Sequence, residues 1–418
     1  MKILMTGDLH MGRGSSKFAD LEPQTSIDCW QAIVDEALER SVDLVLLSGD
    51  VVDRGNCYFE SYMPLQTGVA RLAHSGIMTI AVAGNHDFNV LPKLTDHIDT
   101  EMFRLLGCGG EWEQFEFNCG TETLGLTGWS FPEAHVKISP LDSFPETNNS
   151  SDYYIAMVHG DLNASASKYA PLSSNRINEL SQHHWLLGHV HKPVLTSTER
   201  DRWVLYPGSP QALDPGESHH HGVWLWEPHL QQQPVFLPLS SVCYEPLSID
   251  VSECADPEEI LGHVIRNIKK NAESLKNSAH QRMCAVNYRI EITGECDNPA
   301  EVVTLLESQS SFDFSFDDVQ ASVEYLRINV LPRFDKAVLR EQKTVLARAF
   351  NLLESLETGN YDGEIEQLLG QIQQSCSQHA RRYHSLDDDH ELQHSDIINI
   401  AKTQLTQIVS DLRGQRDE

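Results

Sequence analysis

Basic residues are scarce in this sequence. Its 418 residues contain 31 Lys and Arg against 61 Asp and Glu, which gives a formal net charge of −30 with His neutral. The field of such a surface repels nucleic acids, anionic membranes and phosphorylated substrates. The composition therefore excludes a protein that coats DNA nonspecifically through its own positive charge.

Long apolar runs and paired cysteines are absent as well. No apolar run approaches the roughly 20 residues that cross a bilayer, so we expect no membrane span. Charged residues come too early at the N-terminus for a signal peptide. None of the nine cysteines forms a CxxC pair, so we expect reduced thiols, no structural zinc site and a cytoplasmic protein.

The sequence does contain enough apolar residues, 40%, to build folded cores, and its length predicts two or three domains. Up to residue 240, short β-branched, aromatic or Leu-rich runs alternate with helical patterns, which predicts a layered α/β domain. We expect strands at 2–6, 43–48, 77–83, 123–129, 153–158, 184–187, 203–206 and 222–226, and helices at 26–40 and 59–74.

A segment rich in Gln, Pro and Ser at 231–241 predicts a domain boundary. Beyond it we expect a small α+β domain over 241–331 and a helical C-terminal segment over 332–418. The predicted strands are 247–251, 285–293 and 322–330, and the predicted helices are 257–275, 299–309, 336–357, 362–383 and 395–413. The last helix carries one apolar stripe, which packs within its own domain or docks on a partner helix.

Five short motifs rich in Gly, Asp, Asn and His lie within residues 1–240, four of them directly after predicted strands. They are Gly7-Asp8-Leu9-His10, Gly49-Asp50-Val51-Val52-Asp53-Arg54-Gly55, Gly84-Asn85-His86-Asp87, Val158-His159-Gly160-Asp161 and Gly188-His189-Val190-His191. Loops at strand ends of an α/β sheet converge on ligands, and these donors suit manganese, iron or zinc. Any one motif alone is an ordinary turn; the five together predict a metal site.

The set of motifs resembles the signature of the calcineurin-like metallophosphoesterase superfamily. Within it, the run Gly188-His189-Val190-His191-Lys192-Pro193 followed by Tyr206-Pro207-Gly208-Ser209-Pro210 is similar to the SbcD-type DNA repair exonucleases, and the YhaO-like branch is close. The resemblance covers 1–240 with specific motifs and 243–330 less specifically. It implies an αββα metallophosphoesterase sandwich, a capping (DNA-binding) domain and a helical partner-binding segment.

The resemblance also implies a site for two divalent metal ions, with Mn²⁺ as the expected metal. Asp50 would bridge the ions, and the other ligands would divide between them: Asp8, His10 and His191 on one side, and Asn85, His159 and His189 on the other. His86 would contact the scissile phosphate and protonate the leaving oxygen. Asp87 would orient a ligand.

The position three residues after Asp50 departs from some nucleases of this class, which place a second catalytic His there. This chain has Asp53, followed by Arg54. Asp53 is either a turn or salt-bridge residue or a substrate contact. Because Asp53-Arg54 resembles the phosphoprotein phosphatases, in which the arginine holds a phosphate, a phosphoesterase acting on phosphoproteins or cyclic nucleotides stays an alternative.

Other conspicuous residues have simpler interpretations. We expect His183 and His184 to serve packing, and the aromatic group Trp224, Trp226 and Phe236 to belong to a sheet core. The run 219–221 of three histidines is expected at a loop tip rather than at a third metal site. Arg381-Arg382 is expected to be a solvated patch.

Taken together, the resemblance implies a metal-dependent DNA exonuclease and endonuclease that hydrolyses phosphodiester bonds in repair or defence. It further implies a homodimer and a partner, an SMC-like (SbcC-type) ATPase bound through the C-terminal helices. A non-catalytic scaffold with the same fold is a second alternative. The charge of −30 then predicts that the isolated chain binds DNA weakly and that the partner supplies the basic surface.

Overall fold

The structure, a computed structural model, describes residues 1–414 except 18–25, 54–57, 99–100, 147–149, 165, 181–182, 201, 231–232, 280–281, 309–313, 317, 334–343, 360 and 381–393. It divides into two compact units. The first comprises Met1–Glu245, Ala272–Asn287 and Phe314–Ala321, and the second comprises Pro246–Asn271, Tyr288–Asp313 and Ser322–Glu418. The predicted division into three domains at 240 and 331 stays a prediction.

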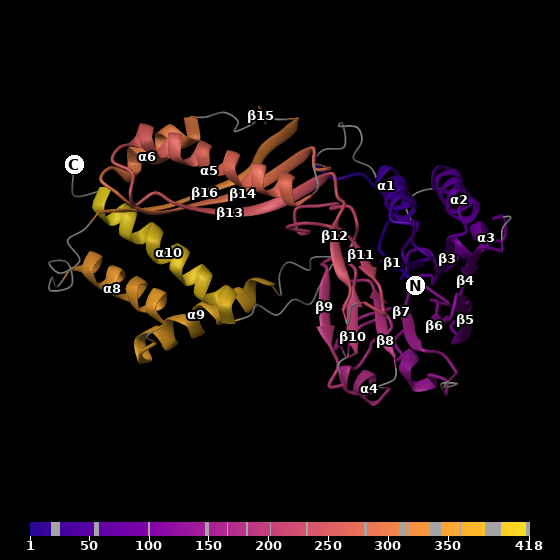
Figure 1. The fold of residues 1–418 in the computed structure, drawn as a ribbon. Coiled ribbons are helices and arrows are strands. Elements are labelled where there is room, and N and C mark those ends of the chain that lie inside the picture. The colour runs from indigo at the N-terminus through magenta and orange to yellow at the C-terminus, as the bar shows by residue number, and fades with distance from the viewer. Residues whose placement is uncertain are drawn as a thin grey trace. The chain divides into compact units, whose positions relative to one another are not determined.

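The first sheet of the first unit has the strand order β12-β11-β1-β2-β3-β4 (Figure 1). Four neighbouring strands run parallel, and β11 and β12 continue the sheet antiparallel beyond β1. The strands are β1 (Ile3–Thr6), β2 (Leu44–Leu47), β3 (Met78–Ala81), β4 (Phe103–Leu105), β11 (Gly222–Trp226) and β12 (Val235–Pro238).

The second sheet has the order β5-β6-β7-β8-β10-β9, again with four parallel strands in the middle and one antiparallel strand at each edge. Its strands are β5 (Glu113–Cys119), β6 (Glu122–Trp129), β7 (Tyr153–His159), β8 (His184–Gly188), β9 (Val194–Ser197) and β10 (Trp203–Tyr206). Parallel strands need crossover connections, which is why polar loops gather at the same edge.

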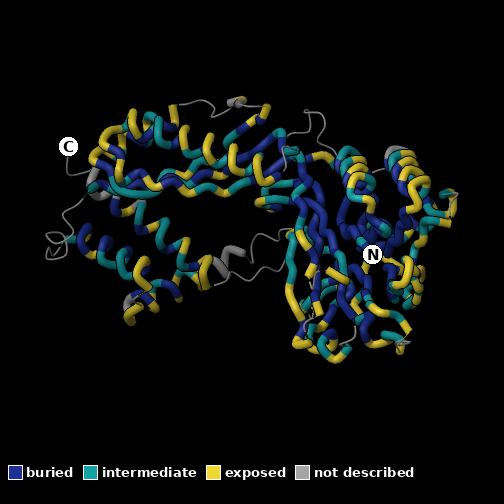
Figure 2. The backbone as a smooth tube through the Cα atoms, in the orientation of Figure 1, coloured by how far each residue is buried: buried dark blue, intermediate teal, exposed yellow. Residues whose placement is uncertain are grey.

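The two sheets pack face to face over one apolar core, to which Trp203, Trp224 and Trp226 contribute with the aliphatic residues of β1, β2, β3, β6 and β7. Helices α1 (Ser26–Glu39) and α2 (Tyr58–His74) cover the other face of the first sheet through residues such as Trp30 and Leu65. The other face of the second sheet is covered by the short helix α4 (Ser174–Glu179), the 3₁₀ turn η1 (Pro140–Ser143) and loops. This layered sandwich confirms the predicted fold class. Figure 2 shows the strands of the sandwich largely in the dark blue of buried residues.

A third sheet, ordered β13-β14-β16-β15, spans the residues that follow. Its strands are β13 (Val242–Asp250), β14 (Ala285–Cys296), β15 (Phe314–Phe316) and β16 (Val319–Pro332), and its helices are α5 (Pro257–Ser278) and α6 (Pro299–Ser308). Helix α5 buries Ile260, Val264 and Ile268, and Tyr288 of β14 donates a hydrogen bond to the carbonyl of Ile268 at 3.3 Å. This mixture of strands and helices is the α+β character expected of this region.

The C-terminal helices α8 (Val345–Thr358), α9 (Gly363–Ala380) and α10 (His394–Gly414) share a separate apolar cluster. The stripe of α10 is buried in it at Ile397, Ala401, Leu405 and Val409. Of the two expectations for that stripe, packing within its own domain is therefore confirmed. Arg381-Arg382 and the start of the helix predicted at 336–357 lie outside the described residues.

The sequence does not predict the strands β4, β5, β9, β12 and β15. It does not predict the short helices α3 (Leu91–Thr95) and α4 either. None of the helices in the described part of the chain has the length and apolar character needed to cross a membrane.

Candidate metal centre

The polar motifs gather at the carboxyl ends of parallel strands from both sheets of the first unit. Asp8 follows β1, Asp50 follows β2 and Asn85 follows β3, while His159 ends β7 and His189 follows β8. Backbone hydrogen bonds join the first two loops, from Asp8 N–H to the carbonyl of Gly49 and from His10 N–H to the carbonyl of Asp50, each 2.9 Å long. The strand ends therefore place side chains that are far apart in sequence in one site.

The backbone at this site is held in a conformation that L-residues rarely adopt. Among the predicted ligands, four have positive φ angles: Asp8 at 49°, His10 at 44°, Asp50 at 47° and His189 at 97°. Such residues cost about 1–3 kcal/mol each and cluster where function requires them. Glycine allows the loops that carry these ligands to pack closely. A Cβ on Gly188 would lie 2.0 Å from the carbonyl oxygen of Ser48.

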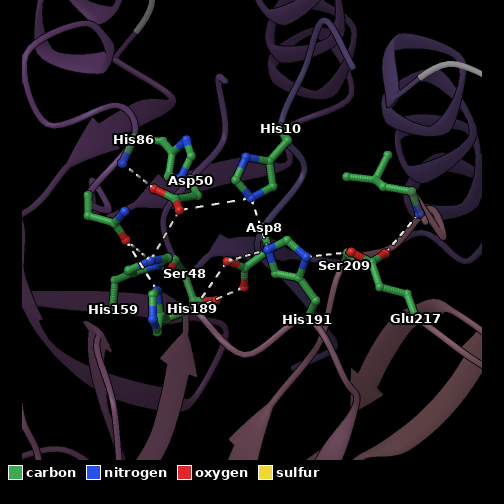
Figure 3. A network of polar contacts seen from close by, with 12 residues as sticks. Asp8, His10, Ser48, Asp50, His86, His159, His189, His191, Ser209 and Glu217 are labelled. Atoms are coloured by element: carbon green, nitrogen blue, oxygen red, sulfur yellow. Dashed lines mark hydrogen bonds and ion pairs between the residues drawn. The ribbon is translucent and has the colours of Figure 1, made fainter. Parts of the chain in front are cut away.

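One side of the site contains Asp8, His10 and His191, which can present ligand atoms within 4.8 Å of one another. The Nε2 atoms of His10 and His191 lie 3.1 Å apart, and Asp8 Oδ1 is 4.0 Å from His191 Nε2 (Figure 3). Asp8 and His10 are fully buried. Two imidazole nitrogens that face each other beside a carboxylate repel unless a proton or a metal ion lies between them, so this geometry fits a cation.

The other side is built on Asp50, His159, Asn85 and His189. Asp50 Oδ2 lies 3.2 Å from His159 Nε2 and 3.9 Å from His10 Nε2, so this carboxylate faces both sides of the site. The side-chain oxygen of Asn85 lies 3.0 Å from His159 Nε2 and 3.2 Å from His189 Nδ1. All seven predicted ligands thus meet in one cluster, with Asp50 between the two groups.

The cluster stabilises positive charge. Burial opposes the charged form of His159, but Asp50 beside it raises the pKa of His159 to about 9. Burial likewise opposes the charged form of His191, while Glu217 and Asp8 raise its pKa to about 9. Burial would also raise the pKa of Asp50, yet His159, His10 and His86 hold it well below its usual range. Carboxylate, amide and imidazole donors in such a field fit divalent ions of the manganese, iron or zinc type.

His86 is partly exposed at the edge of the cluster and pairs with Asp53. Its backbone N–H donates to Asp50 Oδ1 at 2.8 Å, and its Nδ1 lies 3.1 Å from Asp53 Oδ1. The hydrogen bond to Asp53 raises the pKa of His86 against the effect of burial. Asp53 also lies 3.5 Å from His10 Nδ1, so it contacts the predicted acid and a predicted ligand together.

A sequence model of the calcineurin-like phosphoesterase family matches residues 1–213, about half of the chain. The chain belongs to the calcineurin-like phosphoesterase family. This family hydrolyses phosphoesters with divalent metal ions, which agrees with the donor set of the cluster.

The similarity to individual proteins is more distant. The chain is 26% identical over 226 residues to the uncharacterized metallophosphoesterase YhaO of Bacillus subtilis (strain 168), and the match spans 53% of the chain and 54% of YhaO, about half of that relative's length. A dimetal phosphatase from Danio rerio matches 54% of the chain and 91% of its own at 13% identity and a TM-score of 0.35. The phosphoesterase YfcE from E. coli matches 57% of the chain and 93% of its own at 15% identity and a TM-score of 0.28.

Asp87, expected to orient a ligand, acts on the backbone in this phosphoesterase fold. Its Oδ1 accepts the N–H of Gly84 at 2.7 Å, and its Oδ2 accepts the N–H of Val51 at 2.7 Å. Burial and the charge of Asp50 raise the pKa of Asp87 to about 7. The loops that carry Asn85 and Asp50 are therefore tied to each other through this side chain. Arg54 lies outside the described residues.

Two carboxylates beside the ligands were not predicted. Asp161 Oδ1 lies 3.3 Å from His189 Nε2, and Glu217 Oε1 lies 2.5 Å from His191 Nδ1. Asp161 stands two residues after His159 in a motif that was recognised, so its position could have drawn attention. Glu217 is 26 residues from His191, and no spacing rule links the two.

His183 and His184 serve packing, as expected, and His221 is held by hydrogen bonding. His183 and His184 are buried, and the ring of His184 stacks on Trp203 at a centroid distance of 4.6 Å. Trp224 and Trp226 are buried in the core between the sheets, and Phe236 packs against it, as predicted. His221 is buried rather than exposed at a loop tip, because its Nδ1 contacts Ser209.

Proposed function

We propose that the chain is a Mn²⁺-dependent DNA nuclease of the SbcD type that hydrolyses phosphodiester bonds. The observation that carries this proposal is the position of the Asp50 carboxylate. It faces both groups of candidate metal ligands, and its Oδ1 accepts the backbone N–H of His86. Membership of a metal-dependent phosphoesterase family supports the reaction class. The similarity of the 188–193 and 206–210 runs to SbcD-type nucleases supports DNA as the substrate.

Each side chain has a part in this proposal. Asp8, His10 and His191 would hold one divalent ion, Asn85, His159 and His189 the other, and Asp50 would contact both. Bound there, two such ions neutralise phosphate charge and make a water nucleophilic at neutral pH. His86, whose pKa is raised by its hydrogen bond to Asp53, would bind the scissile phosphate and deliver a proton to the leaving oxygen.

The assembly belongs to the proposal as well. We infer a homodimer in the cytoplasm and an SMC-like (SbcC-type) ATPase bound by the C-terminal helices. The apolar stripe of α10 is used internally, so removing α10 would also uncover α8. Among the described residues of α8 and α10, the exposed large apolar side chains that a partner could contact are Val345 and Ile408.

Substitutions at these two positions test the partner. The Val345→Glu, Ile408→Glu double variant is expected to lose co-purification with an SMC-like (SbcC-type) ATPase co-expressed with it, while keeping its unfolding temperature. Lys402→Glu, which changes charge but no exposed apolar residue of the helix, serves as the control. Co-purification of the double variant at the unchanged yield would contradict binding through α8 and α10.

A phosphatase or cyclic phosphodiesterase is the second candidate, favoured by the sequence Asp53-Arg54. Asp53 contacts His86 and His10, an arrangement that serves either substrate class. The candidates separate in one assay: the purified chain with Mn²⁺ is given labelled duplex DNA, hairpin DNA, a cyclic nucleotide and a phosphopeptide at equal concentrations. We expect cleavage of the DNAs. Intact DNA alongside hydrolysed cyclic nucleotide or phosphopeptide would refute the nuclease proposal.

A further inference from the structure

Glu217 is a buried carboxylate whose two oxygens are both used. Its side chain is 8% exposed. One oxygen, Oε1, lies 2.5 Å from His191 Nδ1, while Oε2 accepts the hydroxyl of Ser209 and the backbone N–H of Leu213, both at 2.8 Å. A buried carboxylate is costly unless it is paired and hydrogen-bonded. The hydrogen bonds from Ser209 and Leu213 fix the orientation of the Glu217 carboxylate, so that Oε1 faces His191.

The contact with Glu217 determines which nitrogen of His191 carries the hydrogen. A carboxylate is only an acceptor, so Nδ1 is the donor and the lone pair of the neutral ring is on Nε2. That Nε2 atom is the one that faces His10 Nε2 at 3.1 Å and Asp8 Oδ1 at 4.0 Å. Figure 3 shows His191 between Asp8 and Glu217.

The loop around His191 adds a second restraint. Ser209 N–H donates to the carbonyl of His191 at 2.9 Å, and the hydroxyl of Ser209 reaches Glu217. Gly208 has a φ of 78°, and a Cβ there would lie 2.5 Å from the His191 carbonyl oxygen. The segment from Gly208 to Glu217 therefore wraps the backbone and the ring of this one ligand.

The histidines of the other side are held differently. His189 Nε2 lies 3.3 Å from Asp161 Oδ1, a carboxylate whose side chain is 24% exposed. His159 Nδ1 lies 3.1 Å from the backbone carbonyl of Ser48. Among the carboxylates that contact a ligand histidine without being predicted ligands themselves, Glu217 makes the shortest contact and is the most buried. Its loss therefore acts unequally on the two sides.

We propose that Glu217 is the positioning residue of His191 and determines how tightly the side formed by Asp8, His10 and His191 holds its divalent ion. The proposal rests on the two-metal centre of the proposed function and is independent of the substrate. Outer carboxylates of this kind change metal affinity by about 10–100-fold in other metal sites.

The Glu217→Gln variant is the sharpest test. The backbone N–H of Leu213 cannot change its role, so it requires the amide oxygen, and the amide NH₂ then faces His191 Nδ1. Because this NH₂ donates a hydrogen bond, Nδ1 of His191 must accept it. The hydrogen of the neutral ring then lies on Nε2, the atom that faces the metal site. A Glu217→Ala variant leaves space instead, in which Nδ1–H can bond to water. We therefore expect the glutamine to weaken metal binding more than the smaller alanine does.

The measurement is Mn²⁺ binding to the full chain without DNA, by equilibrium dialysis and by electron paramagnetic resonance. We expect Glu217→Gln to weaken one of the two ions about 10–100-fold, so that an isolated-ion spectrum replaces that of the coupled pair at limiting Mn²⁺. Ser209→Ala, which keeps the carboxylate and removes one of its donors, is expected to weaken the same ion less. Asp214→Asn, a carboxylate of the same loop that accepts the N–H of Gly216, is the matched control and should bind as the unaltered chain does.

Three results would overturn the proposal. Glu217→Gln could bind both ions as tightly as the unaltered chain does, or it could bind both ions more weakly by the same factor. The third is that Glu217→Ala binds Mn²⁺ more weakly than Glu217→Gln does. If Glu217→Ala fails to fold, the comparison of Glu217→Gln with Ser209→Ala and Asp214→Asn decides. An unaltered chain that binds fewer than two ions contradicts the two-metal centre itself. That outcome is distinct from a failure at Glu217.

Discussion

At the scale of single residues, the partners of each histidine decide its chemistry. His86 pairs with Asp53 and is partly exposed, His159 pairs with Asp50 and is buried, and His183 is buried among aromatic rings. A carboxylate partner favours the charged ring, whereas burial without one favours the neutral ring. The same kind of side chain therefore occupies three different environments within one unit, as the proposed acid, as a proposed metal ligand and as a core residue.

The pairing of His86 with Asp53 leads to a prediction about catalysis. His86→Ala is expected to lower the rate of phosphodiester cleavage by about 10²–10⁴-fold, because a positioned acid contributes that much, while the Mn²⁺ content stays unchanged. Asp53→Asn should lower the rate less, since His86 remains but loses the partner that raises its pKa. The checks are initial rates at saturating Mn²⁺ and metal analysis of the same samples. Loss of metal from the His86→Ala variant would mean that this residue is a ligand.

Acid sensitivity of folding is a second prediction at this scale. Burial and then the charge of Arg202 lower the pKa of His183 to about 4, and burial, Arg202 and His183 lower that of His184 to about 3. Both values lie below that of an unfolded chain, about 6.5. Below pH 6.5 the unfolded chain binds protons that the folded chain does not, so stability present at higher pH is lost as pH falls toward 4 and 3.

His183→Phe is expected to remove part of this loss. Nε2 of His183 has no hydrogen-bond partner among the described residues, and its ring contacts Phe144 and Tyr154, so phenylalanine is compatible with the position. Between pH 7.5 and 5.5 the variant should lose about 1.4 kcal/mol less unfolding free energy than the unaltered chain. Urea unfolding at the two pH values gives the number, and the exposed His74→Gln serves as control. An equal loss in the His183→Phe variant would show that His183 is already charged in the fold.

At the scale of elements, the site depends on how closely the strand ends approach one another. Gly188 ends β8, and a Cβ there would lie 2.0 Å from the Ser48 carbonyl oxygen and 2.4 Å from His159 Nδ1. Neither neighbour can move freely, because one is backbone after β2 and the other is a buried ligand. Small side chains at this crossing are therefore a condition for bringing the two sheets' ligands together.

Gly188→Ala is accordingly expected to destabilise the fold by about 1–3 kcal/mol, the usual cost of overpacking, and to weaken Mn²⁺ binding in the molecules that remain folded. Gly14→Ala, where an added Cβ meets nothing within 4 Å, should change neither quantity. Denaturant unfolding in EDTA and metal titration at low temperature separate the two effects. Equal stability of the two variants would mean that the strand ends have room to relax.

Elements also explain how much could be predicted. The central strands β1, β2, β3, β7 and β8 are mostly apolar because both of their faces are largely buried, and the polar motifs lie at or directly after their ends. β4 and β15 have only three residues, and β5 alternates half-buried and exposed side chains in a polar sequence at a sheet edge, so neither length nor hydrophobicity reveals them. Glu217 could not be predicted because its contact with His191 depends on how the loop from Gly208 folds back, which no local pattern encodes.

At the scale of the whole molecule, the net charge of −30 conflicts with a DNA substrate unless the attraction is local. Asp8 and Asp50 are buried in the cluster. Two divalent ions would bring four positive charges against these two carboxylates, so the metal-loaded site would attract phosphate while the remaining surface repels it. On this argument DNA affinity of the isolated chain would depend on the metal, and the proposed partner would supply the basic surface.

Binding of DNA to the His86→Ala variant, which is expected not to cleave, measures this directly. In EDTA we expect a dissociation constant weaker than about 10⁻⁴ M at physiological salt, the weak end of non-specific binding. Mn²⁺ should tighten it, with a shallow dependence on salt because few phosphates are neutralised. Fluorescence anisotropy of a labelled duplex between 50 and 200 mM salt gives both quantities. Tight binding in EDTA with a steep salt dependence would instead reveal a basic surface on this chain. The proposed partner would then be unnecessary for holding DNA, and the acidic excess would have to be concentrated away from the metal site.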